Sequence, residues 1–599
     1  MIRRSPDRKS SLFLEGSALP KEIIFYLKEH NIESILTKAF NEIIKVLPID
    51  PFSDICSILK SESRDIFSIN SIKIKDTIIE DFKSIPSFEL TMTFKGATRT
   101  VLTYPIPFSS GAFEKYNTSN EELGKTFSEI FSEEVKNLDY EDPKQFDDKI
   151  VDIIKNKNKE NDVMTLSLSN TLSLMIFIST ALMKNINFTK YIVENKSNLI
   201  LKKANRIKGR TPNLGFCIFK TGKSMNSKIK YERFLIMINN EIFNNESIDN
   251  KKKLIIDLYK KMFEIIKKTL TAGKAGENGM KTNNEGSFTP PSDKYEDVLK
   301  LMENFIKEIN TSMDNKNIVS LGIDFNADNF YNSKDSTYEP EGVKKPIDNV
   351  QLADSYIKLI NDHPLLSYLE QPMAYEDIDG WGTLLEKLKD KPNISVVQKA
   401  DIYRKDPEPK IPPADINNNN DINKEKKEEV KVEEPKEKVE TKTKKVNKKK
   451  KKNVEQAKPE ETQNKTNENF KKEKPKINMF SYRLGEAKVI SDLFNNILKL
   501  KEKNADFGAV IYENDIESNQ AGIINLGMAL NFDYIILNGV NMSDQKITKI
   551  KEYIEEIDNI NEIKNIVIED TGKKNEINNE NINNDNKIGE EVKGNNEKK

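Results

Sequence analysis

The sequence predicts an α/β protein built around a barrel, and three observations lead to this prediction. The apolar run Ile318-Val-Ser-Leu-Gly-Ile-Asp ends in an acid at Asp324, and the run Ser367-Tyr-Leu-Glu ends in an acid at Glu370. Between them, residues 351–360 repeat apolar side chains at the i, i+3, i+4, i+7 spacing of an amphipathic helix. Strand, helix and strand with acids at matching ends are typical of an α/β barrel, which carries its chemistry at the carboxyl ends of its strands.

The two strand-end acids point to a metal rather than to another kind of site. Paired carboxylates suit a hard, oxygen-seeking cation such as Mg²⁺, so Asp324 and Glu370 are candidate metal ligands. His30 and His363 each lack a second His or Cys at ligand spacing, so we expect no zinc site.

Composition limits the partners and the compartment. The 599 residues suffice for two to four domains, and 95 Lys+Arg against 96 Asp+Glu leave a formal charge of −1. This balance favours neither nucleic acid nor an anionic membrane as a partner. Only Cys56 and Cys217 are present, which indicates a reducing, cytoplasmic setting. The most apolar stretch, 164–183, contains Ser, Thr and Asn, so we expect a buried helix there, with a membrane span as the alternative.

The first 62 residues predict a tail and a small helical unit. Residues 1–17 are basic and polar and read as a flexible tail. Residues 18–62 repeat apolar side chains at helical spacing, and Pro48-Ile-Asp-Pro divides them into a hairpin of two helices. About 40 residues cannot bury enough surface alone, so we expect the hairpin to dimerise or dock. Packing of the hairpin on the body of the protein is the alternative.

The remaining chain divides by pattern and composition. Residues 68–205 begin with three alternating, strand-like segments and continue as helices, which predicts an α+β domain. Residues 206–408 and 477–571 alternate between strand and helix, which predicts the two parts of a barrel. Residues 409–476 are almost wholly Lys, Glu, Asn, Thr and Pro, so we expect a disordered insertion, and residues 572–599 read as a disordered tail. The lysine run of the insertion could contact acidic surfaces, but its flanking glutamates favour a solvated spacer.

Two sets of motifs resemble known families. Gly322-Ile-Asp-Phe-Asn-Ala-Asp-Asn-Phe-Tyr, Leu352-Ala-Asp-Ser-Tyr, Leu369-Glu-Gln-Pro and Gly380-Trp are similar to the metal-bearing core of enolase. This resemblance implies an enolase-type α+β N-terminal domain followed by a TIM-like barrel. Residues 18–62, with the turn Pro48-Ile-Asp-Pro-Phe, resemble the RIIα and Dpy-30 class of docking domain. That resemblance implies a homodimer whose groove holds an amphipathic helix of a scaffold protein.

The enolase resemblance assigns roles to individual positions. Enolase dehydrates 2-phosphoglycerate with two Mg²⁺ ions, a Lys base and a Glu acid. Glu285, in Asn-Glu-Gly-Ser-Phe-Thr-Pro, matches the general acid. The alternative is that Glu285 is a loop acid that caps the next helix. Asp324 and Glu370 match two metal carboxylates. The position of the third metal carboxylate is occupied by Ala400. Asp401 could take this role if the alignment shifted by one residue, and the nearby Lys399 would compete with the cation. The resemblance therefore implies a weakened Mg²⁺ site.

The other catalytic positions depart from the family. Phe480 falls at the position of the base, and Arg483 is the nearest cation but cannot act as a base. The positions that grip the substrate read Glu513, Asn514, Asp515 and Leu537, and the two acids would repel a phosphate. The architecture resembles the enolase-like proteins of sperm and cilia. We therefore expect a degenerate enolase that serves as a structural component of a ciliary or flagellar axoneme, with an active glycolytic phosphopyruvate hydratase as the alternative.

Overall fold

The computed structural model describes most of the chain outside the charged insertion. The described residues are 21–78, 84–106, 120–194, 211–239, 246–272, 276–283, 286–314, 317–400, 477, 479–503, 507–513 and 522–559. They belong to one compact unit, formed by Met1–Ile402 and Pro475–Lys599. The expected tails, the insertion 409–476, and four positions of interest lie outside the described residues, namely Glu285, Asp401, Asn514 and Asp515.

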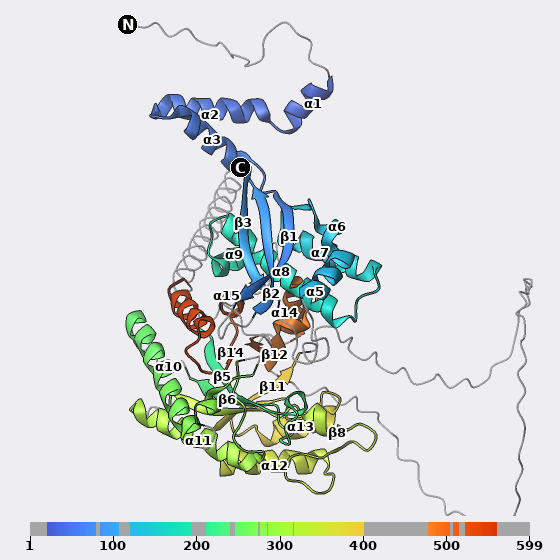
Figure 1. Ribbon diagram of the computed structural model, residues 1–599, viewed down its shortest axis with the longest axis vertical. Coiled ribbons are helices and arrows are strands. Elements are labelled where there is room, and N and C mark those ends of the chain that lie inside the picture. Colours follow the sequence, from blue (N-terminus) through green and yellow to red (C-terminus); the bar gives the residue numbers. More distant parts are fainter. Residues whose placement is uncertain are drawn as a thin grey trace, which may run out of the picture. The chain divides into compact units, whose positions relative to one another are not determined.

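Three helices precede the sheet, where the sequence predicted two. They are α1 (Lys21–Glu29), α2 (Ile32–Val46) and α3 (Pro51–Glu62) (Figure 1). Asn31 has a left-handed backbone (φ 49°) and separates α1 from α2. Asp50 begins α3 by accepting a hydrogen bond from the Ser53 amide at 3.1 Å, and Pro51 occupies the first helical position. Ala39 is the only fully buried hydrophobic residue of these three helices, and ten large hydrophobic side chains between residues 23 and 52 are exposed.

An α+β domain follows the three helices. Its antiparallel sheet has the order β3-β2-β1-β4. The strands are β1 (Phe67–Ile78), β2 (Ser84–Phe94), β3 (Ala97–Pro105) and the short β4 (Asp139–Tyr140), which the sequence did not predict. Lys95 and Gly96, both with positive φ, form the turn between β2 and β3. The helices are α5 (Asn120–Phe127), α6 (Glu133–Val135), α7 (Pro143–Asn156), α8 (Val163–Met183) and α9 (Phe188–Glu194), with a π-helical turn at Ser128–Ser132.

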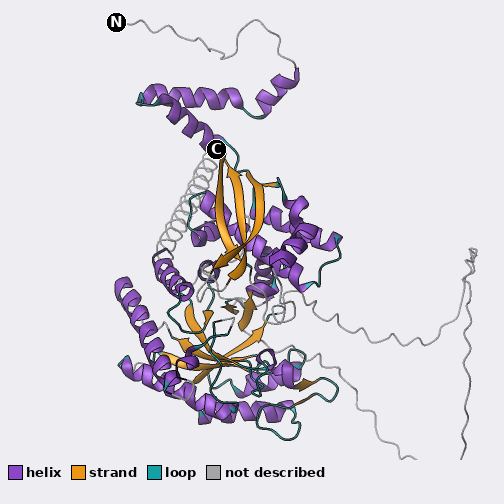
Figure 2. Ribbon diagram, in the orientation of Figure 1, coloured by secondary structure: helices purple, strands orange, loops and turns teal. Residues whose placement is uncertain are grey.

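The second part is a closed barrel of eight strands, which confirms the predicted α/β fold class (Figure 2). The strands, in order around the barrel, are β5 (Asn213–Lys220), β6 (Arg233–Ile238), β7 (Val319–Asp324), β10 (Leu366–Glu370), β11 (Ser395–Lys399), β12 (Met479–Arg483), β13 (Gly508–Tyr512) and β14 (Tyr534–Asn538). β6 runs antiparallel to both of its neighbours, whereas all other neighbouring strands pair in parallel. The first amino acids of β6 therefore share a rim with the last amino acids of the other strands.

Helices cover the outside of the barrel. They are α10 (Ile248–Thr271), α11 (Tyr295–Ser312), α12 (Asn349–Asp362), α13 (Ile378–Lys387), α14 (Ile490–Lys503), α15 (Gly522–Ala529) and a last helix whose described part is 544–559. A small hairpin, β8 (Tyr331–Asn332) and β9 (Thr337–Tyr338), follows β7. Side chains alternate between the helix-facing and the inward-facing side of each barrel strand. The inward cluster consists of Cys217, Leu235, Met237, Tyr368, Val397, Val510, Tyr512 and Ile536, with Met479 and Tyr534 packed against it.

Helix α8 explains the apolar stretch noted in the sequence. By length and composition, Met164–Met183 could cross a membrane, but 89% of its most apolar window is buried within the protein. Its polar side chains bind the segment that follows β12. Ser169 and Asn170 donate hydrogen bonds to the carbonyls of Lys488 and Ala487, each at 2.9 Å. The residues that interrupt the apolar stretch thus attach the α+β domain to the barrel.

Asp147 of α7 strengthens this attachment and gives a pH-dependent prediction. The buried carboxylate accepts hydrogen bonds from the Ser491 amide at 3.0 Å and the Ser491 hydroxyl at 2.6 Å, at the start of α14. Burial raises the pKa of Asp147 to about 7, although hydrogen bonds from Ser173 and Ser491 oppose the rise, and the nearby charge of Asp492 adds to it. The folded protein therefore holds a proton that the unfolded chain releases between about pH 4 and pH 7.

The free energy of unfolding should fall as the pH rises through this window, because the folded state binds the additional proton. The contribution of Asp147 is at most about 4 kcal/mol. Asp147→Asn should remove it, which urea unfolding at pH 5 and pH 8 would measure as a smaller difference between the two pH values. Asp148→Asn, at an exposed neighbour in an ion pair with Lys144, is the control. Equal pH dependence in the wild type and Asp147→Asn would contradict the prediction.

Candidate functional site

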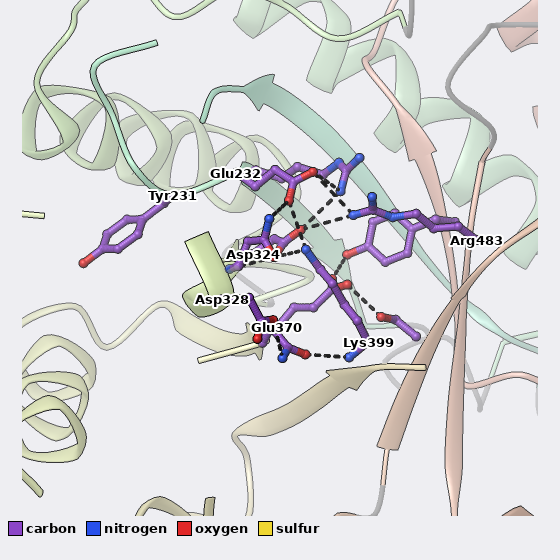
Figure 3. A network of polar contacts seen from close by, with 12 residues as sticks. Tyr231, Glu232, Asp324, Asp328, Glu370, Lys399 and Arg483 are labelled. Carbon is purple, nitrogen blue, oxygen red and sulfur yellow. Dashed lines mark hydrogen bonds and ion pairs between the residues drawn. The ribbon is translucent and has the colours of Figure 1, made fainter. Parts of the chain in front are cut away.

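The candidate site lies at the rim that the antiparallel β6 shares with the carboxyl ends of its neighbours. In the strand register, Asp324 lies opposite Arg233 on one side and opposite Glu370 on the other. Lys399 ends β11 and Arg483 ends β12. Figure 3 shows the side chains of Glu232, Asp324, Lys399 and Arg483 turned toward one another.

Asp324 is fully buried and is surrounded by the protein's own cations. Its carboxylate lies 2.9 Å from Nζ of Lys399, 3.2 Å from the guanidinium of Arg233 and 3.6 Å from that of Arg483. The Asn326 amide donates a further hydrogen bond to Asp324 at 3.1 Å. An ionised carboxylate in the interior needs such compensation, because a buried charge without a partner is strongly unfavourable.

Glu232 is the second acid bound to the Lys399 ammonium. Its Oε2 lies 3.0 Å from Lys399 Nζ, and its Oε1 lies 3.3 Å from Arg233 and 3.5 Å from Arg483. Asn326 donates from its side-chain amide to Oε2 at 2.5 Å. Burial alone would raise the pKa of Glu232, but the charges of Lys399, Arg233 and Arg483 together hold that pKa well below its usual value.

Glu370 is compensated by hydroxyl groups instead. Its carboxylate accepts hydrogen bonds from Ser481 Oγ at 2.7 Å, from the Tyr368 hydroxyl at 3.1 Å and from the Tyr512 hydroxyl. Burial, and then the charge of the neighbouring Asp324, raise the pKa of Glu370 above its usual value.

Tyr512 joins the acids and the cations into one network. The Arg233 and Arg483 guanidinium carbons lie 5.4 and 5.8 Å from the centre of its ring, within the range of cation–π attraction. Because its hydroxyl also bonds Glu370, the side chain of Tyr512 links both guanidinium groups to the buried carboxylate.

Gln371 fixes the end of β11, and with it Lys399. The Lys399 amide donates to Oε1 of Gln371 at 2.8 Å, and Nε2 of Gln371 donates to Asp328 at 2.8 Å. Asp328 also accepts from the Tyr375 amide at 2.8 Å, and burial raises its pKa. The backbone of Lys399 at the end of β11 is therefore held by a chain of hydrogen bonds through Gln371, Asp328 and Tyr375.

These side chains do not fit Mg²⁺. The Lys399 ammonium lies between the carboxylates of Asp324 and Glu232, where a cation would have to lie, and Glu370 accepts three hydroxyl donors. Within the described residues, no group of three or more His, Cys, Asp or Glu side chains could hold a metal ion. The sequence predicted Asp324 and Glu370 as metal ligands, and the structure instead gives them protein partners.

The orientation of Phe480, the predicted position of the base, follows from its neighbours in β12. Met479 faces the barrel interior, so alternation along β12 turns Ser481 and Arg483 inward and Phe480 outward, where its ring lies 6.0 Å from that of Phe507. The ring of Phe480 therefore points away from the barrel interior, because successive side chains of a strand face opposite sides.

Leu537 and Glu513 are both buried and contact other parts of the protein. Ile536 faces the interior, so Leu537 packs in the outer layer against the helices and cannot stand where a substrate would be gripped. Glu513 is buried and pairs with Lys546 at 2.8 Å and with Lys549, both in the last helix. Burial would raise the pKa of Glu513, but the two lysines lower it. The charge of Glu513 is therefore compensated within the protein.

Several members of the site escaped the sequence prediction. Lys399 was identified only as a competitor of the metal and Arg483 only as the nearest cation, while the ion pairs of Arg233 and the link through Tyr512 were not foreseen. The available signal is that Arg233, Lys399 and Arg483 each place a cation at the rim end of an apolar barrel strand. Such a charge requires a buried acid nearby.

Comparisons with known proteins agree with the barrel. Residues 211–401 match the family described as enolase, C-terminal TIM barrel domain. The enolase of Methanococcus aeolicus is 24% identical over 172 residues, which are 29% of this chain and only 37% of that relative. The enolase of Methanococcus maripaludis is 21% identical over 54% of this chain and 71% of its own length. The enolase of Ehrlichia chaffeensis is 23% identical over 55% of this chain and 73% of its own length.

The eight-stranded barrel, the acids at the ends of β7 and β10, and these matches agree with one another. Identity to these relatives is low, between 21% and 24%. Residues 211–401 of the chain are thus similar to the barrel domain of enolases.

Proposed function

We propose that the protein is an enolase-like protein of the enolase 4 type, whose barrel does not turn over 2-phosphoglycerate and which serves as a scaffold component of a cytoplasmic ciliary or flagellar assembly. The observation that carries the first half of the proposal is the Lys399 ammonium between Asp324 and Glu232, at 2.9 and 3.0 Å. The negative charges of Asp324 and Glu232 are thereby compensated within the protein.

The chemistry of the rim supports a barrel without turnover. Enolase chemistry needs cations that neutralise the carboxylate of the substrate and a base that takes a proton from the neighbouring carbon. The Lys399 ammonium is engaged by two carboxylates and has no lone pair to accept a proton. Arg483 stays protonated at all ordinary pH values, and Ser481 donates its hydroxyl to Glu370.

A second candidate function is an active phosphopyruvate hydratase. Asp324 and Glu370 stand at adjacent strand ends, the relatives are named enolase, and a lysine lies at the centre of the rim. This function would require Lys399 to leave both of its carboxylates so that it could act as a base.

The helices α1 to α3 support the scaffold half of the proposal. Large hydrophobic side chains cover their surface, with exposed fractions of 67% for Ile44 and 78% for Phe52. The others are Ile23, Ile24, Phe25, Tyr26, Phe40, Val46, Leu47 and Ile49. Apolar surface of this kind marks an interaction site. In the proposal, two copies pair through these helices, as the resemblance to RIIα and Dpy-30 docking domains implies, and the groove holds an amphipathic helix of a scaffold protein. Neither nucleic acid nor a membrane is a partner.

A lyase assay tests the proposal. The purified full-length protein, given 2-phosphoglycerate and Mg²⁺, should form no phosphoenolpyruvate above the rate without protein. The enolase of Methanococcus maripaludis, assayed in the same buffer, is the positive control. Turnover that disappears in Glu285→Gln would overturn the proposal and favour the hydratase. Additional loss in Lys399→Met would identify Lys399 as the base.

A further inference from the structure

Lys399 occupies the position of a cation in the centre of the rim. Its Nζ lies 2.9 Å from Asp324 Oδ1 and 3.0 Å from Glu232 Oε2, and the side chain is only 20% exposed. The two acids come from different strand ends, at β7 and just before β6, so the ammonium joins elements that are distant in sequence. It binds two carboxylates at nearly equal distance, as a metal ion would.

Charge counting supports the same interpretation. Around the carboxylates of Glu232, Asp324 and Glu370, the described rim places four cations, those of Lys220, Arg233, Lys399 and Arg483. These cations compensate the three carboxylates without any ion from solution. A divalent cation added to it would leave an excess of positive charge in a buried place, which is unfavourable.

We propose that Lys399 is a built-in counterion that replaces a divalent cation, and that the centre of the barrel accepts a metal ion only when this ammonium is removed. The inference does not depend on the proposed scaffold role, because it concerns only what compensates Asp324 and Glu232. In this proposal, Lys399 is a positioning residue that holds the carboxylates of Asp324 and Glu232 in place.

The distances indicate which ion would enter after the removal. The two carboxylate oxygens lie 2.9 and 3.0 Å from Nζ. An ion at that point would need them to approach by about half an ångström for Ca²⁺, whose ligands lie at about 2.3–2.6 Å, but by nearly an ångström for Mg²⁺ at about 2.0–2.1 Å. We therefore expect Ca²⁺ to bind first. Arg233 and Arg483 stay in place, so binding should be weak.

The test compares Lys399→Met with the wild type in thermal unfolding and in calorimetric titration with CaCl₂. Methionine keeps most of the length of the side chain and removes the charge. Without Ca²⁺, the variant should melt about 5–10 °C below the wild type, because Asp324 and Glu232 lose their shared partner. With millimolar Ca²⁺ it should recover part of this loss and show saturable binding. The wild type should show neither effect.

Two further variants control the experiment. Lys387→Met removes a lysine that pairs with Asp354 at 2.6 Å on the outside of the barrel, and it should create no Ca²⁺ response. Asp324→Asn combined with Lys399→Met removes both charges, so it should melt above Lys399→Met and bind no Ca²⁺. This double variant also keeps the test decisive if Lys399→Met does not fold.

Three results would overturn the inference. The first is Ca²⁺ or Mg²⁺ binding by the wild type at the rim, detected as a shift in melting temperature that Asp324→Asn abolishes. The second is a stable Lys399→Met variant that binds no Ca²⁺. The third is a double variant no more stable than Lys399→Met.

Discussion

Asp324→Asn should lower the free energy of unfolding by about 3–5 kcal/mol, one of the largest effects that a single substitution in this barrel can have. Asp324 is fully buried, and its carboxylate contacts Lys399, Arg233 and Arg483 within 3.6 Å. Replacing the carboxylate with an amide leaves these cations with one acid fewer in a region with little water. Urea unfolding at pH 7 measures the loss.

A matched substitution separates this effect from a general cost of losing an aspartate. Asp354 pairs with Lys387 at 2.6 Å, but its side chain is 61% exposed, so Asp354→Asn should change stability little. The result for Asp324→Asn should also be the same with EDTA and with MgCl₂. If the loss of stability appears only when Mg²⁺ is present, Asp324 holds a metal ion, and its assignment to the internal cations is wrong.

Ile44→Asp combined with Phe52→Asp should convert a dimer into a monomer. Both side chains are more than two-thirds exposed in the single chain, and α1 to α3 bury only Ala39 among their hydrophobic residues. The substitutions therefore remove little packing within one copy. If a second copy covers the surface, however, they bury two carboxylates in an apolar interface, which costs several kcal/mol. Light scattering of the full-length protein gives the mass directly.

Asn41→Asp is the control for this double substitution, because it introduces a negative charge at an exposed polar position of α2. It should leave the mass unchanged. If the wild type is already a monomer, or if the double variant stays a dimer, these helices do not mediate self-association. Retained dimers would then point to the barrel or the α+β domain as the interface.

Much of the fold follows from local sequence pattern. The acids that end β7 and β10 stop short apolar runs, and the alternation in 84–105 predicts β2 and β3 with their turn at Lys95 and Gly96. Such signals lie within ten or so residues of one another, which is the range over which alternation and turn chemistry act. The α/β class is therefore readable from the sequence.

The antiparallel direction of β6 is not readable in this way. The sequence Arg233–Ile238 does not indicate in which direction the strand runs, because all six residues are buried. Yet this direction brings Arg233 and Glu232 to the rim, where they meet Asp324 and Lys399. The direction depends on pairing with β5 and β7, which is a tertiary property.

The outward orientation of Phe480 and Leu537 could not be read from the motifs. Aligning a strand by its motif locates a residue only to within one position. A shift of one position exchanges the inward and outward faces of the strand. In β12 the inward side chains are Met479, Ser481 and Arg483. The polar character of Ser481 and the charge of Arg483 within a buried strand are a local hint of the correct face.

A crystal structure of the full-length protein grown with millimolar MgCl₂ tests the central claim most directly. We predict the Lys399 ammonium between Asp324 and Glu232, Tyr512 and Ser481 hydrogen-bonded to Glu370, and no metal ion at the rim. A Mg²⁺ ion bound by Asp324 and Glu370, with Lys399 withdrawn from both of its carboxylates, would contradict it.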